Sequence, residues 1–262
     1  MRTIHRVLDP DRPDETLCCR CALALMTKAP RAGKVKTRLV PPLMNEEAAE
    51  LNRCFLRDTA TAISAACRRL TARKRTHPVA CGIAVYTPIG AESDYADILP
   101  TDFSLLRQRG EDFGERLYFA AEDLFKCGFE TVCLIDSDSP TIPTENFLRA
   151  VELLSSPDDR IVLGPCDDGG YYLIGLRQLH REVFEGIDWS TERVFEQTKQ
   201  RAVQIGLEVC ELPRGFDVDD RATLHRLCDE LLGESARDNV APETKEFLRK
   251  LLACDDEGRF WS

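Results

Sequence analysis

Thr131–Pro140 reads TVCLIDSDSP, an apolar run that passes directly into alternating aspartates and serines. The first five residues, Thr131–Ile135, predict a buried strand, because a short apolar run bounded by turn-forming residues is typical of a strand in the interior of a sheet. Asp136 and Asp138 leave this strand two positions apart, so their side chains point to the same side and are able to share a hard cation. The alternative is that these aspartates and serines only cap the helix that follows.

Similar apolar runs lie on both sides of this stretch and alternate with amphipathic segments. This alternation predicts an α/β fold, a three-layer αβα sandwich with a mostly parallel, Rossmann-like sheet. In such sheets the ligand binds beyond the carboxyl ends of the strands, where the irregular charged segments of this chain fall. The predicted strands are Cys19–Met26, Val79–Tyr86, Ser104–Gln108, Thr131–Ile135, Arg160–Gly164, Tyr171–Leu176 and Leu207–Leu212. The predicted helices are a long one from Asn45, then Phe113–Cys127, Pro143–Leu154, Thr191–Ile205, Asp219–Leu232 and Pro242–Leu252.

The composition of the chain excludes several classes of protein. Its 262 residues carry a formal charge of −10, which argues against broad nucleic-acid binding, and no stretch approaches the length of a membrane span. Residues 1–17 are polar, resemble no targeting signal and predict a flexible arm, with residues 18–262 forming a single domain. The twelve cysteines are mostly spread singly, which favours reduced thiols and a cytoplasmic location over disulfides or structural zinc.

A basic loop follows the first predicted strand. Lys28, Arg31, Lys34, Lys36 and Arg38 fall within eleven residues and no acid lies among them. Fixed cations beside loop amides suit a diphosphate or triphosphate, and Gly33 allows the backbone to approach a ligand closely. The alternative is a solvated loop whose cations pair with surface acids. The P-loop pattern is absent, because it needs glycine at positions 30 and 35, which are Pro30 and Val35.

Two further segments place acids between predicted elements. PCDDGG, at 165–170, sets Asp167 and Asp168 beside Gly169 and Gly170 in a turn between two strands, where carboxylates and amides are able to meet a sugar hydroxyl. FDVDD, at 216–220, again sets two carboxylates two positions apart. Asp217 is therefore a candidate to complete a metal shell, whereas Asp219 is equally suited to capping the helix that follows.

Six motifs now stand in order along the chain: KAPRAGKVKTRL, QRGEDFGERL, LIDSDSPTIP, LGPCDDGGYYLIGL, DWST and FDVDD. Together, from about Leu23 to about Leu227, they resemble the GT-A-type transferases often called selenodomain-associated transferase 1, within the nucleotide-diphospho-sugar transferase superfamily. The resemblance implies a GT-A fold that binds the diphosphate of a nucleotide through Mg²⁺ or Mn²⁺. It extends more distantly to 2-phospholactate and molybdenum-cofactor guanylyltransferases.

The resemblance also implies roles for particular residues. The expected metal ligand is Asp138, and Asp136, which stands where the family often has glycine, either adds a ligand or is incidental. Asp217 joins the expected metal set from the FDVDD spacing and not from the resemblance. The expected nucleotide and phosphate site consists of Lys28, Gly33, Lys36, Thr37, Arg38, Gly110, Gly114 and Arg116. The expected donor or acceptor pocket consists of Asp168, Gly169, Gly170 and Trp189.

The function expected from the sequence is a metal-dependent glycosyltransferase with a nucleotide-diphospho-sugar donor and a small acceptor. In this hypothesis Asp168 orients or deprotonates the acceptor hydroxyl. One alternative is a nucleotidyltransferase that joins a nucleoside triphosphate to a phosphorylated small molecule and releases pyrophosphate. The other is a nucleotide-binding module without turnover, against which the retained acids count. The sequence makes no prediction of the oligomeric state.

Overall fold

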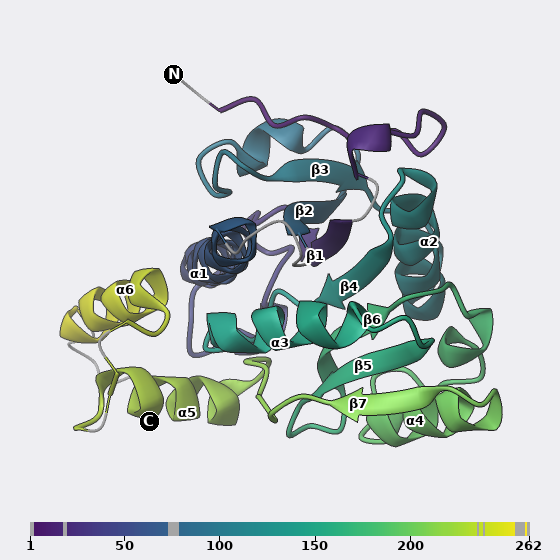
Figure 1. The fold of residues 1–262 in the computed structure, drawn as a ribbon. Helices are drawn as coiled ribbons and strands as arrows, with labels where there is room; N and C mark the ends of the chain where they lie inside the picture. Colours follow the sequence, from purple (N-terminus) through teal and green to yellow (C-terminus); the bar gives the residue numbers. More distant parts are fainter. Residues whose placement is uncertain are drawn as a thin grey trace.

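A seven-stranded sheet forms the centre of the computed structural model, which describes residues 3–17, 20–72, 79–234, 236–237, 239–254 and 260. The strand order is β3-β2-β1-β4-β6-β5-β7, and the sheet runs through the middle of the molecule in Figure 1. The predicted strands are confirmed to within two residues at each end. Their bounds are β1 Arg20–Lys28, β2 Val79–Thr87, β3 Ser104–Arg107, β4 Thr131–Ile135, β5 Arg160–Pro165, β6 Tyr171–Leu176 and β7 Glu208–Glu211.

Only one strand of this sheet runs against the others. β1, β2, β3 and β4 pair in parallel, β5 and β7 also pair in parallel, and β6 is antiparallel to both β4 and β5. The prediction of a mostly parallel sheet is therefore confirmed. Because β6 is reversed, its first residue lies at the edge of the sheet where the other strands end. The segments after β1, β4 and β7 and the turn between β5 and β6 thus meet at one edge.

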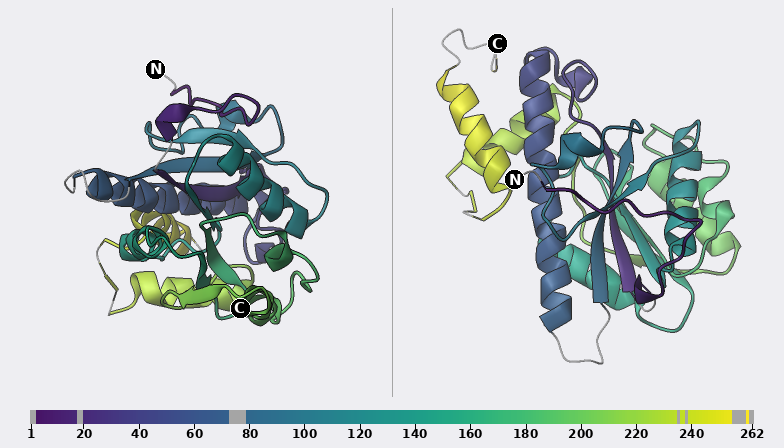
Figure 2. Two further views of the ribbon diagram at one scale, coloured as in Figure 1. Left: turned by 45° about the vertical axis from the view of Figure 1, so that its right-hand side comes forward. Right: turned by 90° about the horizontal axis from the view of Figure 1, so that it is seen from above.

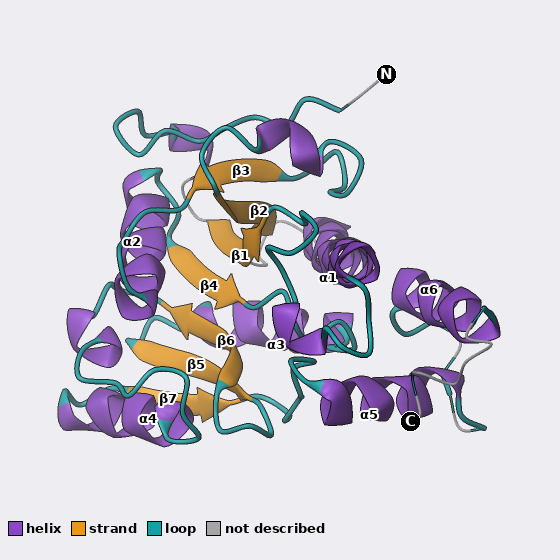
Figure 3. Ribbon diagram, turned by 180° about the vertical axis from the view of Figure 1, so that it is seen from behind, coloured by secondary structure: helices purple, strands orange, loops and turns teal. Residues whose placement is uncertain are grey.

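Helices cover both faces of the sheet and make the predicted three layers. α1 and α3 pack on one face, and α2 and α4 pack on the other, as the view from above in Figure 2 shows. Outside the α1 and α3 layer, α6 lies beside α1, and α5 packs against α6 (Figure 3). The bounds are α1 Asn45–Ala72, α2 Phe113–Lys126, α3 Thr144–Leu154, α4 Val194–Gln204, α5 Arg221–Leu232 and α6 Pro242–Ala253. Short 3₁₀ helices span Glu15–Leu17, Thr37–Leu39, Glu92–Tyr95 and Arg181–Phe184.

Each face of the sheet has its own apolar core. Leu23 and Leu25 of β1 point to the α1 side, whereas Ala22 and Ala24 point to the α2 side, as the two-residue period of a strand requires. β4 is buried along its whole length, which accounts for its uninterrupted apolar sequence. A strand buried on both faces holds the residues that follow it in a fixed position.

A third apolar cluster joins α1 to the two C-terminal helices. Asp58 of α1 accepts hydrogen bonds from the backbone N–H groups of Glu243 and Thr244, at 3.0 and 2.9 Å. Since the residue before α6 is Ala241, which has no capping side chain, Asp58 supplies the N-terminal cap from another helix. α6 is thereby tied to α1 by both apolar packing and a cap.

The N-terminal segment differs from the mobile arm that the sequence predicts for residues 1–17. Within residues 3–17, Leu8 N donates to Leu105 O at 2.8 Å, and Leu105 N donates to Arg6 O at 2.7 Å, so the segment extends the edge of the sheet beside β3. His5 and Leu8 are buried there. The buried residues of this segment stand singly among charged ones, so the segment lacks the alternating apolar pattern that would have predicted a strand.

Two further observations bear on the sequence predictions. The ten cysteines within the described residues are all free thiols. Among the helices of the described segments, none has both the length and the apolar character that crossing a bilayer requires.

Candidate functional site

A cavity of about 640 Å³ opens at the carboxyl edge of the sheet. Residues from the ends of β1, β2, β3 and β4, from the β5–β6 turn and from the segment before α5 contribute to its wall. Nine of the predicted site residues line it: Lys28, Arg38, Arg116, Asp136, Asp138, Asp168, Gly170, Trp189 and Asp217. Six lie outside the wall: Gly33, Lys36, Thr37, Gly110, Gly114 and Gly169. The basic loop and the acidic turn therefore reach the same cavity.

The ammonium group of Lys36 forms the contact between the basic loop and the acidic turn. Its Nζ lies 2.8 Å from Oδ1 of Asp138, donates to the carbonyl of Val218 at 2.6 Å and lies 3.5 Å from Oδ1 of Asp219. The Lys36 side chain is 3% exposed. An ammonium has three N–H donors, and three protein oxygens lie within 3.5 Å of this one. Lys36 thus holds Asp138 in place, and its predicted contact with phosphate stays a prediction.

Asp219 pairs with the basic loop and does not cap α5. It lies 3.2 Å from Nη1 of Arg38. The N-cap of α5 is Asp220, whose carboxylate accepts from Thr223 N in a capping box. The helix therefore begins two residues later than predicted, and Asp219 is left to face Lys36 and Arg38.

Asp136 lies at the buried end of β4. Its backbone N–H donates to Tyr172 O at 2.9 Å, and its Oδ2 accepts from Ser139 Oγ at 2.7 Å. Burial, reinforced by the charge of Asp138, raises the pKa of Asp136 well above its ordinary value. Asp136 and Asp138 thus occupy different environments although they leave the same strand.

The β5–β6 turn places Asp168 opposite Asp217. Gly169 has φ +88°, and a Cβ there would lie 2.1 Å from Glu192 O, so the turn needs glycine at this position. Asp168 Oδ1 accepts from Gly170 N at 2.8 Å. The turn is hence rigid, and it aims a carboxylate into the cavity.

The segment that carries Asp217 is held by backbone bonds to its neighbours. Asp167 N donates to Gly215 O at 3.1 Å, Gly215 N donates to Pro165 O at 2.9 Å, and Val218 N donates to Asp138 O at 2.9 Å. These bonds fix Asp217 between the β4 end and the β5–β6 turn. Burial, with the charge of Asp168 adding to it, raises the pKa of Asp217 to about 6.

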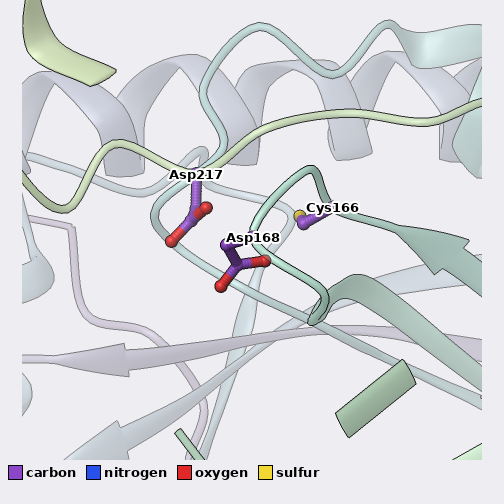
Figure 4. A group of neighbouring side chains, drawn as sticks. All are labelled: Cys166, Asp168 and Asp217. Carbon is purple, nitrogen blue, oxygen red and sulfur yellow. The ribbon is translucent and has the colours of Figure 1, made fainter. Parts of the chain in front are cut away.

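Within the part of the chain that the structure describes, one group of metal-ligating side chains comes together. Cys166 Sγ and carboxylate oxygens of Asp168 and Asp217 all lie within 4.8 Å of one another, and Figure 4 shows the three side chains converging. Asp217 belongs to the metal set that the sequence predicts. Asp136 and Asp138 lie outside this group, and Asp168, expected to serve the acceptor, lies inside it.

Cys166 is a neighbour of this site that the sequence interpretation missed. It was grouped with the singly spaced, apolar cysteines, although it leaves β5 two positions before Asp168. The same rule that pairs Asp136 with Asp138 would have paired Cys166 with Asp168. Burial, together with the charges of Asp136 and Asp217, raises the pKa of the Cys166 thiol, so the thiol form is favoured over the thiolate.

The remaining predicted residues lie around the cavity. Lys28 ends β1 at the surface, and Gly33 and Thr37 are exposed in the loop between β1 and α1. Arg116 donates from Nε to Gly110 O at 3.4 Å and from Nη2 to Glu111 O at 2.9 Å. Gly114 lies in the first turn of α2, against Trp189.

Comparison with known proteins places this fold and site in a class. A nucleotide-diphospho-sugar transferase, so named provisionally, from Desulfovibrio desulfuricans G20 is 30% identical to this chain. The match has a TM-score of 0.75 and covers 90% of this chain and 96% of that one. The fold is therefore that of the nucleotide-diphospho-sugar transferases.

The family follows from the same comparison. The model of the family "Uncharacterized protein conserved in bacteria (DUF2064)" matches residues 69–191, and this chain belongs to that family. The predicted resemblance is thus confirmed. No curated protein matches the sequence.

Two more distant structures also match this chain. A 4-diphosphocytidyl-2C-methyl-D-erythritol synthase is 11% identical, with a TM-score of 0.48 over 79% of this chain and 96% of that one. Rv0371C of Mycobacterium tuberculosis H37Rv, solved in complex with manganese, is 15% identical, with a TM-score of 0.43 over 79% and 97% of the two chains. At these scores neither likeness bears on the function of this chain.

Proposed function

We propose that this protein is a metal-dependent glycosyltransferase that uses a nucleotide-diphospho-sugar as donor. The observation that carries the proposal is the 2.8 Å contact between Lys36 Nζ and Asp138 Oδ1 at the wall of the cavity. It brings the basic loop and the acidic turns, far apart in sequence, to one edge of the sheet. A ligand that carries negative charge and also binds a divalent cation fits both.

The phosphate contacts are assigned to the exposed cations of the cavity. Lys28, Arg38 and Arg116 all line it. Arg38 is 74% exposed at the side chain, and its only described carboxylate partner is Asp219, 3.2 Å away. A guanidinium so placed is free to form the paired hydrogen bonds that a diphosphate accepts. Lys36, being buried, acts in this proposal by positioning Asp138.

The carboxylates of the cavity fit a hard divalent cation. Burial raises the pKa values of Asp217 and Asp136, and the neighbouring carboxylates, Asp168 and Asp138 respectively, add to each shift. A cluster of this kind is stabilised by Mg²⁺ or Mn²⁺, which prefer oxygen ligands. We assign Asp217 and Asp138 as ligands in preference to Cys166, because Mg²⁺ and Mn²⁺ prefer carboxylate oxygens to a thiol. When bound, such a cation neutralises charge on the departing nucleoside diphosphate.

Asp168 has one oxygen committed and one available. Oδ1 accepts from Gly170 N at 2.8 Å, which leaves Oδ2 to accept a hydrogen bond from the acceptor hydroxyl and to take its proton. The proximity of Asp168 to Asp217 also suits it to bind the cation. The substitution Asp168→Asn separates these roles, because loss of a base lowers kcat alone, whereas loss of a ligand also weakens Mn²⁺ binding.

The reaction is tested by its products. Purified protein is incubated with Mn²⁺, a panel of nucleotide sugars and nucleoside triphosphates, and a panel of small alcohols and phosphorylated small molecules as acceptors, and the released nucleotides and pyrophosphate are measured. Release of a nucleoside diphosphate from a nucleotide sugar is expected, and Asp138→Asn should abolish it. Asp11→Asn is the matched control, because Asp11 is an exposed carboxylate outside the cavity wall. Pyrophosphate release from a triphosphate, or no turnover of any nucleotide, would contradict the proposal.

A further inference from the structure

The cavity has a second, apolar part that the proposed chemistry does not use. Its wall consists of side chains from the first turns of α2, from β4 and β6, and from the segment before α4: Phe113, Leu117, Leu134, Ile174 and Trp189. Diphosphate and metal binding require charged and polar groups; of those assigned above, Arg116 comes from α2 and the others come from the β1, β4 and β5 ends and the segment before α5. The apolar part therefore needs a separate explanation.

An open aromatic pair dominates this apolar part. The rings of Phe113 and Trp189 meet edge to face, with centroids 5.1 Å apart and an interplanar angle of 67°. Phe113 is 53% exposed although it is a large apolar side chain. Apolar surface left open in a concave wall is stabilised when a ligand covers it, at roughly 25 cal/mol per Å².

The position of Trp189 is built into the fold. A Cβ on Gly114 would lie 2.6 Å from Nε1 of Trp189, so glycine in the first turn of α2 makes room for the indole. The loop that carries it is closed by Asp188 and Gln197. Asp188 N donates to Gln197 Oε1, and Gln197 Nε2 donates to Asp188 Oδ2, both at 2.8 Å. The aromatic pair is hence formed before any ligand binds, which lowers the cost of binding.

The aromatic pair lies on the Asp168 side of the cavity. Phe195 N donates to Gly169 O at 2.8 Å, which joins the segment after Trp189 to the turn that carries Asp168. A molecule whose hydroxyl meets Asp168 would place its remaining atoms toward Trp189 and Phe113. Lys28, at the end of β1, and Arg38, in the loop that follows, also line the cavity.

We infer that the acceptor of this enzyme is an alcohol with an apolar body, either a ring or a short chain, that packs on Phe113 and Trp189. This inference rests on the proposed function, because it assumes glycosyl transfer at this site, and it adds the chemical class of the acceptor. The nucleobase of the donor is the rival occupant, since bases also stack on aromatic rings.

The test uses the fluorescence of Trp189 in the full-length Trp261→Phe protein, in which Trp189 is the one remaining tryptophan. The probe is 2-phenylethanol, and ethanol is its matched partner without the ring. Saturable quenching by 2-phenylethanol and none by ethanol is expected. Phe113→Ala should lower the affinity for 2-phenylethanol about fivefold, because an aromatic contact contributes about 1 kcal/mol. Val203→Ala, which removes an exposed apolar side chain of α4 outside the cavity wall, should leave the affinity unchanged.

Equal affinity in the Phe113→Ala protein, or no saturable quenching by 2-phenylethanol, would overturn the inference. So would saturable quenching by nucleoside diphosphates that compete with the probe, because the pocket would then hold the base. None of these readouts needs turnover. Hydrolysis of a nucleotide sugar, in which water takes the glycosyl group and the nucleoside diphosphate is released, tests the proposed function separately, so the two failures are distinguishable.

Discussion

Lys36 and Asp138, which are 102 positions apart in the chain, form an ion pair of 2.8 Å in which the lysine side chain is 3% exposed and the aspartate 37% exposed. The pair joins the loop after β1 to the turn after β4. Since Lys36 also donates to Val218 O, it fixes a third segment, the one that carries Asp217. The buried ammonium of Lys36 thus sets the relative positions of the loop after β1, the turn after β4 and the segment that carries Asp217.

Removal of this cation should destabilise the protein. Lys36→Met leaves the partly buried carboxylate of Asp138 and the carbonyl of Val218 without their donor. Loss of one partner of a fully buried pair costs about 3–5 kcal/mol, and the partial exposure of Asp138 reduces the expected loss in unfolding free energy to about 2 kcal/mol. Urea denaturation measures it. Lys34→Met is the matched control, since Lys34 is exposed in the same loop. Equal urea denaturation midpoints for the two variants would show that the Lys36–Asp138 pair does not stabilise the fold.

In the metal-free protein, Asp217 should contribute a loss of stability as the pH rises from about 4 to about 6. Asp217 has its pKa raised to about 6 in the folded chain against 3.8 in the unfolded chain, so between these values the folded state binds the proton more tightly. The contribution of Asp217 to the stability is then greatest below pH 4 and declines as Asp217 ionises. Each unit of pKa corresponds to about 1.4 kcal/mol, and screening at this partly exposed group lowers the total to about 1 kcal/mol.

Urea titrations at several pH values in the presence of a chelator check this decline. Asp217→Asn should remove most of it, whereas Asp11→Asn should keep it. An unchanged pH dependence in the Asp217→Asn protein would show that Asp217 ionises normally.

The C-terminal helix should depend on a residue of α1. Asp58→Ala removes the acceptor of two N–H groups at the start of α6 and should lower the unfolding free energy by about 1–2 kcal/mol. Asp58→Asn keeps an acceptor oxygen and should lose less. Limited proteolysis and urea denaturation report on α6, and the idea fails if the alanine and asparagine variants have equal stability.

The sequence predicted the sheet because its strands are short apolar runs bounded by turn-forming residues, and β4 is the clearest of them. It also predicted that the basic loop and the acidic turns meet, since the carboxyl ends of parallel strands share an edge. Both predictions need only local pattern and a general rule of topology.

The remaining features depend on contacts between distant residues. No local signal distinguishes Lys36, which is buried against Asp138, from Lys34, which is exposed. Likewise Asp219 and Asp220 are equally suited to capping a helix, and the choice of Asp220 follows from the partners of Asp219. Cys166 is different, because its two-residue spacing from Asp168 is visible in the sequence. It was missed because a singly spaced cysteine is interpreted as an ordinary reduced thiol.

Calorimetric titration of nucleotide sugars, with and without Mn²⁺, tests the central claim most directly. The account predicts that at least one nucleotide sugar binds, that Mn²⁺ strengthens its binding at least tenfold, and that Asp138→Asn and Asp217→Asn abolish this Mn²⁺ effect while Asp11→Asn retains it. Affinity that is the same with and without Mn²⁺, or the same in the Asp138→Asn and Asp11→Asn proteins, would contradict a diphosphate held between the basic loop and a metal on the acidic turns.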